Sequence, residues 1–182
     1  MKSGQILKEF DIKDGRRILL RTPRWEDLDG LLDLINSAVE EEAEISRDEK
    51  VSRDDELEWL SGLLVRLEKD KTFLLVGEAD GKIMASADIT RQHGYSTHVG
   101  VVGILVGKGF RGLGVGTAIM HTLMEEAKKL GLTVLELTAF ESNKRAIHVY
   151  QKIGFVQTGK VPKKHLKHGE FIDEVIMTKL LE

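Results

Sequence analysis

The sequence has no cysteine and only two prolines in 182 residues. The absence of cysteine excludes disulfide bonds, thiolate metal sites and a cysteine nucleophile. The scarcity of proline, together with a hydrophobic content of 41%, argues against a disordered or low-complexity chain. The sequence also lacks an apolar run long enough to span a bilayer, and its N-terminal stretch lacks the apolar segment of a signal peptide. We therefore expect a cytoplasmic protein with no membrane partner.

No strong excess of one charge is present overall, since the net charge is −3, but the two signs are separated along the chain. Residues 36–70 carry twelve acidic and five basic side chains, whereas residues 143–182 carry eight basic and four acidic ones. Such runs are typical of a solvated helical surface and a basic tail, and they also fit a site with one acidic wall and one basic rim. A nucleic-acid-binding module would be more basic overall, so we expect no nucleic acid partner.

The hydrophobic periodicities predict a single mixed domain of class α/β or α+β. The domain is expected to span 16–182, with 1–15 as an extension or a short hairpin strand. Two hairpin strands are separated by the turn Asp80-Gly81. The expected strands cover 16–22, 72–79, 82–90, 97–107, 132–140 and the regions near 154–161 and 170–181, with "KKHLKHG" as a loop between the last two.

Four helices are expected, and three residues mark their ends. Pro23 suits a first helical turn, because its missing N–H is one that a helix leaves unpaired there. Ser52 is expected to cap the second helix. Gly131 is placed to stop the third, which follows a glycine-rich stretch, and the fourth covers 143–153. The acidic segment 40–50, between the first two helices, is expected to be a loop or an irregular helix.

The glycine-rich stretch "GKGFRGLGVGT", residues 107–117, has the composition of a phosphate-binding turn. It follows a predicted strand and precedes a predicted helix, so free backbone N–H groups at the helix end would face an anion. Glycines let the anion approach the main chain, and Arg111 can add a charge-assisted hydrogen bond. A Walker A loop is excluded, because Gly107-Lys108 is followed by Gly109 and not by Ser or Thr.

Two further patterns fit this stretch. Gly107, Gly109 and Gly112 match a dinucleotide fingerprint, but that motif belongs to the first turn of a doubly wound domain, and here too little chain follows it. Arg111, Gly114 and Gly116 match Arg-x-x-Gly-x-Gly. In full, "FRGLGVGTAIM" resembles the acetyl-CoA pyrophosphate loop of the GNAT superfamily of N-acetyltransferases.

Two other segments are similar to the same superfamily. "SNKRAIHVYQKIGF", residues 142–155, resembles its next motif, and "GEFIDEVIMTKLL" resembles the closing strand of many members. The resemblance covers roughly 16–181 and is nearest to the branch that includes ribosomal-protein-alanine and small-amine acetyltransferases. It implies the GNAT fold, a mixed central sheet of about six to seven strands with about four helices on both faces.

The resemblance also implies where acetyl-CoA binds. The strand edge would pair with the pantetheine amides, as an added strand does, and the N–H of Leu105 or Val106 would polarise the thioester carbonyl. We expect Gly100 and Gly103 to form a bulge that opens this strand. Asn143 is expected to cap its helix and touch the cofactor. The expected cofactor-binding residues are Ile104, Leu105, Val106, Arg111, Gly112, Leu113, Gly114, Val115, Gly116, Thr117, Asn143 and Tyr150.

Proton transfer needs an acid and a base. Tyr150 is the expected general acid, because a phenol can donate to a leaving thiolate. Many relatives carry a glutamate on the pantetheine-binding strand, but "HVGVVGILV" has no acidic residue. The candidates for the base are Asp88, His98 and Glu136. Removal of the proton by water and an amine that is already partly neutral are equal alternatives. No histidine pair has a metal-ligand spacing, so no metal is expected, and His165 and His168 are expected in a solvated basic rim.

Of the components of the reaction, the acceptor substrate is the one that the sequence determines least. By resemblance it would enter between the acidic segment 36–58 and the basic segment 160–172. The first would attract a polyamine, another small amine or a peptide N-terminus, whereas the second would suit an acidic group. A non-catalytic acyl-CoA-binding or sensor module of the same fold is the alternative to an N-acetyltransferase. A homodimer is a further expectation from the resemblance.

Overall fold

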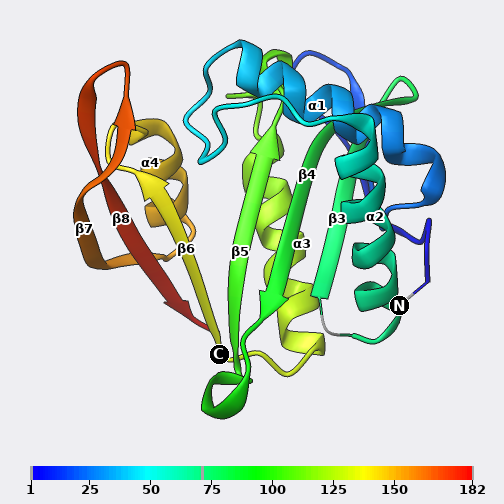
Figure 1. Ribbon diagram of the computed structural model, residues 1–182. Helices are drawn as coiled ribbons and strands as arrows, with labels where there is room; N and C mark the ends of the chain where they lie inside the picture. The colour runs from blue at the N-terminus through cyan, green and yellow to red at the C-terminus, as the bar shows by residue number, and fades with distance from the viewer. Residues whose placement is uncertain (1, 71, 182) are drawn as a thin grey trace.

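The computed structural model describes residues 2–70 and 72–181, and its described strands form one eight-stranded sheet (Figure 1). The strands are ordered β1-β2-β3-β4-β5-β6-β8-β7, and the β5–β6 pair alone is parallel among the pairs described. Their bounds are β1 Ile6–Asp11, β2 Arg17–Arg21, β3 Thr72–Ala79, β4 Lys82–Arg91, β5 Val99–Val106, β6 Val134–Phe140, β7 Val156–Lys167 and β8 Glu170–Leu180.

In the described part of the chain, four α-helices cover the two faces of the sheet. They are α1 Leu28–Glu40, α2 Arg53–Glu68, α3 Val115–Lys129 and α4 Lys144–Lys152. Leucines of α1 and α2 pack with Leu74 and Val76 of β3 on one face. The opposite face of β3, with Phe73 and Leu75, belongs to a larger cluster that includes Ile119 and other residues of α3. Because successive strand residues point to opposite faces, β3 is buried on both sides, which explains its continuous apolar sequence.

The mixed sheet with four helices on both faces confirms the predicted fold, but over residues 2–70 and 72–181 the sheet has eight strands where six to seven were expected. One strand is longer than predicted, since β7 includes most of the expected loop "KKHLKHG". Lys167 pairs with Glu170 across a two-residue turn, His168-Gly169, in which both residues have positive φ. This is the geometry of a tight hairpin turn, and His168 concealed it because asparagine or aspartate is more usual there.

The first helix begins later than predicted. Pro23 lies before it, and a short 3-10 turn, Trp25–Asp27, precedes α1. The buried carboxylate of Asp27 accepts hydrogen bonds from the Arg21 guanidinium at 2.6 and 2.7 Å and from the Arg24 N–H at 2.8 Å. This ion pair joins β2 to the start of α1. A sequence pattern does not reveal it, because the pairing depends on tertiary packing.

The other helix ends agree with the prediction. Ser52 caps α2, since its hydroxyl accepts from the Asp55 N–H at 3.2 Å. Gly131 follows the end of α3 with a φ of +73°. Within the described residues, no helix is both long and apolar enough to cross a membrane.

Candidate functional site

The sheet splits between β5 and β6. The two strands pair only where Val99–Val101 faces Val134–Glu136, while β5 continues to Val106 with β4 as its neighbour. In Figure 1 the two strands diverge as a V toward the end of β5. A cavity of about 1250 Å³ lies in this opening, and residues from both sides line it, including Ile104 and Val106 of β5 and Thr138 of β6.

The register of β4 and β5 decides which backbone groups face the opening. The Gly107 N–H donates to the Met84 carbonyl at 2.8 Å, beside the pair Ala85–Val106. Because bonding directions alternate along an antiparallel ladder, the N–H groups of Ile104 and Val106 point away from β4, toward the open edge. The Leu105 N–H points toward β4. Of the two N–H groups considered from sequence, Val106 therefore faces the opening.

The predicted bulge in β5 is wrong. The β4–β5 register runs without a shift from Val106 to Gly100. The two glycines serve close packing instead: a Cβ on Gly100 would overlap Ile89, and one on Gly103 would lie 2.6 Å from an oxygen of Asp88.

The glycine-rich stretch connects β5 to α3 and lines the cavity. Gly112 and Gly114 have φ of +80° and +91°, which glycine adopts at no steric cost, and Gly114 is the N-cap of α3. A Cβ on Gly114 or Gly116 would meet open space, so the main chain is accessible there. Leu113 and Val115 instead pack into the core, which leaves only their backbone groups available to a ligand.

Arg111 is already bonded to protein groups. Its Nε donates to the Val106 carbonyl at 2.7 Å, and its guanidinium pairs with Glu41 at the end of α1. A different arginine lies against the loop: the guanidinium of Arg145 fills the space where a Cβ of Gly112 would be. Sequence analysis missed Arg145, because no pattern in the sequence shows that the second residue of α4 lies against Gly112.

Tyr150 lies on α4 and borders the cavity. Asn143 caps this helix as predicted, since its Oδ1 accepts from the Ala146 N–H at 3.0 Å. Tyr150 is 9% exposed and its ring packs at a tilt against Phe155. Burial raises the pKa of the Tyr150 phenol to about 12. The group is therefore a neutral hydrogen-bond donor at physiological pH.

The three candidate bases occupy different places, and none is among the described residues that line the cavity. His98 precedes β5, at the end away from the glycine-rich stretch. Glu136 pairs with Val101, where β5 and β6 are still joined. Asp88 is the candidate in contact with the cavity wall, because it lies opposite Gly103 in the ladder and its carboxylate covers that glycine.

The environment of Asp88 changes its acidity. Its ladder partners are Gly103 and Leu74, so it lies on the sheet face covered by α1 and α2. Burial raises the pKa of the Asp88 carboxyl to about 6, against the smaller opposing effects of a hydrogen bond from Thr90 and the charge of Arg66. A carboxylate with this pKa is a competent proton acceptor near neutral pH.

The acidic and basic segments meet on the same side of the molecule. The Lys167 Nζ donates to the Glu42 carbonyl at 2.5 Å, and His168 approaches the Glu42 carboxylate at 3.1 Å. We call residues 41–46, which follow α1, the acidic strap. The Arg111–Glu41 pair joins the strap to the glycine-rich stretch, and its residues 42–46 line the cavity. The strap therefore spans from the glycine-rich stretch to the β7–β8 hairpin.

His165 is not part of a solvated rim. Its ring stacks on Phe140 with centroids 4.0 Å apart, and its Nε2 lies 3.0 Å from the Glu174 carboxylate. Glu174 and Phe140 both border the cavity. His168 is 64% exposed, as the prediction of a solvated rim requires. His165 lies within β7, whereas His168 lies in the turn that follows it, and the sequence spacing alone does not show this difference.

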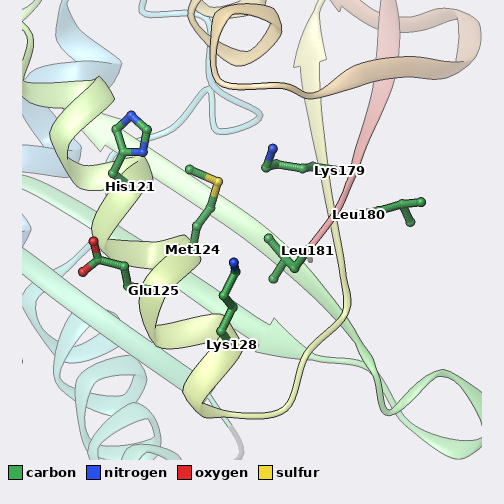
Figure 2. Close-up of a pocket in the computed structure, with 7 residues that line it drawn as sticks. All are labelled: His121, Met124, Glu125, Lys128, Lys179, Leu180 and Leu181. Atoms are coloured by element: carbon green, nitrogen blue, oxygen red, sulfur yellow. The ribbon is translucent and has the colours of Figure 1, made fainter.

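A second, smaller hollow of about 420 Å³ lies between α3 and the end of β8. Figure 2 shows Lys179 extending toward α3, which carries Met124, while Leu180 points away from α3. His121 lines both cavities, which therefore adjoin at this side chain. Among the described residues, no group of three or more His, Cys, Asp or Glu side chains could hold a metal ion.

Residues 31–155 match the model of the Acetyltransferase (GNAT) family. The chain is 33% identical over 108 residues to the L-amino acid N-acetyltransferase AaaT of Escherichia coli, a match that covers 58% of this chain and 67% of the relative. It is 26% identical over 165 residues to the L-amino acid N-acyltransferase MnaT of the same organism, covering 87% of this chain and 91% of the relative.

Solved structures share the architecture. A ribosomal-protein-alanine N-acetyltransferase from Brucella melitensis is 26% identical, with a TM-score of 0.79 over 90% of this chain and 99% of the other. A phosphinothricin acetyltransferase from Sinorhizobium meliloti, solved in complex with AcCoA, is 17% identical, with a TM-score of 0.79 over 90% of this chain and 88% of the other. At that identity the second likeness shows the fold alone.

Proposed function

Because this chain belongs to the GNAT family of N-acetyltransferases, we propose that it transfers the acetyl group of acetyl-CoA to the amino group of a small amine. The α-amino group of an L-amino acid is the first candidate acceptor. The observation that carries the proposal is the open edge of β5, which ends at a bare glycine loop. Tyr150 lines the same cavity, and Asp88 lies against Gly103 of this strand.

The described residues fit acetyl-CoA. The Ile104 and Val106 N–H groups offer the hydrogen bonds that an extended pantetheine arm can take up, as an added strand does. The main chain from Arg111 to Thr117 has accessible glycines at the N-terminus of α3, where backbone N–H groups and the helix dipole favour a diphosphate. Bound there, acetyl-CoA supplies a thioester as the acetyl donor.

The Val106 N–H is the group that would stabilise the developing oxyanion. It faces the opening from the last residue of β5, and Arg111 holds the carbonyl of the same residue. A fixed backbone donor of this kind contributes roughly 3 kcal/mol to an oxyanion. Arg111 would then orient the end of the strand, with the diphosphate held by the backbone of the loop.

Asp88 would act as the base. It lies on the α1/α2 face of the sheet, where the acidic strap also borders the cavity, so an amine entering from that face reaches the thioester beside the carboxylate. The pKa of about 6 leaves Asp88 ionised at neutral pH, ready to take the proton that the amine loses as the new C–N bond forms. His98 and Glu136 lie farther from the opening along the strands and are less suited to this role.

Tyr150 would act on the opposite side. It belongs to α4, which packs with the α3 side of the core, so the phenol faces the cavity from the side away from Asp88. With its pKa raised to about 12, the phenol keeps its proton until negative charge develops on the departing sulfur. It then donates a hydrogen bond to that sulfur, which is the general-acid role predicted for it.

The acceptor class is supported by the relatives and by charge. AaaT and MnaT are named for L-amino acids. The acidic strap and Glu174 border the cavity and would attract the ammonium form of an approaching amine. The basic side chains Lys167 and His168 contact Glu42, so the two segments that conflicted in sequence partly neutralise each other. A peptide N-terminus has the same amino group and is the second acceptor to test.

A thiol-release assay tests the proposal. Acetyl-CoA is supplied with a panel of L-amino acids, methionine sulfoximine, phosphinothricin, polyamines and peptides that begin with alanine. We expect turnover with at least one free α-amino acid and none with its N-acetylated form, which is the matched control. Acetyl-CoA binding without thiol release on any amine would instead indicate the non-catalytic module.

A further inference from the structure

Three basic side chains follow one face of α4. Arg145, His148 and Lys152 are spaced i, i+3 and i+7, which places them on the same side of a helix. All three line the large cavity. We call them the α4 basic stripe. At a rise of 1.5 Å per residue, the stripe extends for about 10 Å along the helix.

Within the part of the chain that the structure describes, no carboxylate pairs with these side chains at salt-bridge distance. Arg111, by comparison, is paired with Glu41, and Lys160 is paired with Asp173 at 2.7 Å. The charges of Arg145 and Lys152 are therefore available to an anion in the cavity. Arg145 also lies directly against the glycine loop, over Gly112.

The first half of α3 also borders the cavity. Gly116, Thr117 and His121 line it from this helix. The cavity is therefore bordered by α3 as far as His121 and by α4 as far as Lys152. A ligand whose diphosphate is held by the loop would extend its nucleoside into this space.

We propose that the α4 basic stripe binds the 3′-phosphate of coenzyme A. This inference rests on the proposed function and adds the residues that recognise the nucleotide end of the donor. A phosphate monoester carries a charge of about −1.5 to −2 at neutral pH, which is more than a diphosphate carries on either phosphorus. Arg145 can bind it through a planar pair of N–H donors, and Lys152 adds a point charge at the far end of the stripe.

The diphosphate itself is a weaker match for the stripe. The loop and the N-terminus of α3 already provide backbone donors for it, and the stripe extends beyond the loop along a different helix. The smaller hollow is also a weaker match, because Glu125 lies there beside Lys128 and Lys179 and reduces the positive charge.

Titration calorimetry with coenzyme A and with dephospho-coenzyme A, which lacks the 3′-phosphate, tests the proposal without requiring turnover. We expect the unaltered protein to bind coenzyme A at least about tenfold more tightly, with the ratio falling as salt rises, since exposed charges are screened. In Arg145→Gln and in Lys152→Gln, the ratio of the two affinities should fall severalfold. The affinity for coenzyme A should decrease, while the affinity for dephospho-coenzyme A should stay the same. Lys144→Gln is the matched control, because Lys144 is an exposed neighbour on the same helix that does not line the cavity.

Two results would overturn the assignment while leaving the proposed function intact. One is equal affinity of the unaltered protein for the two ligands. The other is a loss of both affinities to the same extent in Arg145→Gln, which would place this arginine on the diphosphate. If the unaltered protein bound neither ligand, the proposed function would fail together with this inference.

Discussion

The carboxylate of Asp88 occupies the space that a side chain at position 103 would need: its Oδ1 lies 2.6 Å from the place of a Cβ on Gly103. The two residues face each other in the β4–β5 ladder, at the level where β5 leaves β6. Glycine at 103 therefore allows the proposed base to lie over the strand that would hold the thioester. This contact links a backbone feature of β5 to the proton transfer.

Gly103→Ala should displace the Asp88 carboxylate. A real Cβ does not approach an oxygen to 2.6 Å, so the carboxylate must move away from residue 103. We expect kcat to fall by about tenfold or more, while far-UV circular dichroism and the binding of coenzyme A stay close to those of the unaltered protein. Gly109→Ala is the control, because a Cβ there meets open space outside the cavity. Equal activity of the two variants would contradict the proposed role of the contact.

Asp88→Asn should separate activity from stability. Burial raises the Asp88 pKa from 3.8 to about 6, so the folded state holds a proton that the unfolded state has lost between these values. The stability contribution of this carboxyl is therefore greatest below about pH 4 and declines as pH rises to 6. Above pH 6 the buried charge costs on the order of 2–3 kcal/mol. We expect Asn to raise the thermal midpoint at pH 7.5 and to lower kcat by about a hundredfold.

The same residue predicts a pH profile. For the unaltered protein, kcat/KM should decrease about tenfold per pH unit below pH 6, as Asp88 takes up a proton. In Asp88→Asn, this limb should be absent, while the limb from the acceptor's own ammonium group remains. If the variant kept the full decrease below pH 6, Asp88 would be excluded as the base, and Glu136, His98 or water would remain as candidates.

Tyr150→Phe should lower kcat by roughly a hundredfold, equivalent to about 3 kcal/mol, because the departing sulfur loses its donor. The ring packs against Phe155 and is buried, so phenylalanine keeps the packing and removes only the hydroxyl. Single-turnover kinetics would locate the loss in the chemical step. An unchanged rate, with unchanged affinity for acetyl-CoA, would make Tyr150 a core residue without a catalytic role.

Gly114→Asp should abolish binding of coenzyme A, since it places a carboxylate where the diphosphate is expected. The φ of +91° strains any side chain at this position, so Gly114→Asn is the matched control with the same strain and no charge. We expect the asparagine variant to bind more weakly than the parent but far more tightly than the aspartate variant. Calorimetry with coenzyme A measures both, and equal affinities would show that charge at this position does not matter.

Glu41→Gln should loosen the acidic strap. The Glu41 carboxylate joins the strap to Arg111, and Arg111 also holds the Val106 carbonyl. We expect the KM for the acceptor to rise severalfold with a smaller change in kcat. Glu40→Gln is the control, because Glu40 pairs with Lys50 in an exposed ion pair of little energetic value. Identical kinetics of the two variants would show that the acidic strap does not contribute to acceptor binding.

The local sequence was sufficient for the elements and motifs that depend on short-range patterns. The strand, glycine-rich stretch and helix at residues 97–130 follow from hydrophobic period and turn chemistry, as do the Ser52 and Asn143 caps. The two motifs at 107–117 and 142–155 indicated the family correctly. The motifs also predict a phosphate-binding role for Arg111, but they do not show that its guanidinium pairs with Glu41.

Tertiary structure alone decided the contacts between distant residues. Glu41 lies 70 positions from Arg111, and their pairing leaves Arg145 as the arginine over the loop. The β4–β5 register, and not the composition of either strand, directs the Val106 N–H to the open edge and places Asp88 on Gly103. Sequence patterns determine local conformation and the burial of one face, whereas register and ion pairing depend on how separate segments pack, and that information appears only when the chain is folded.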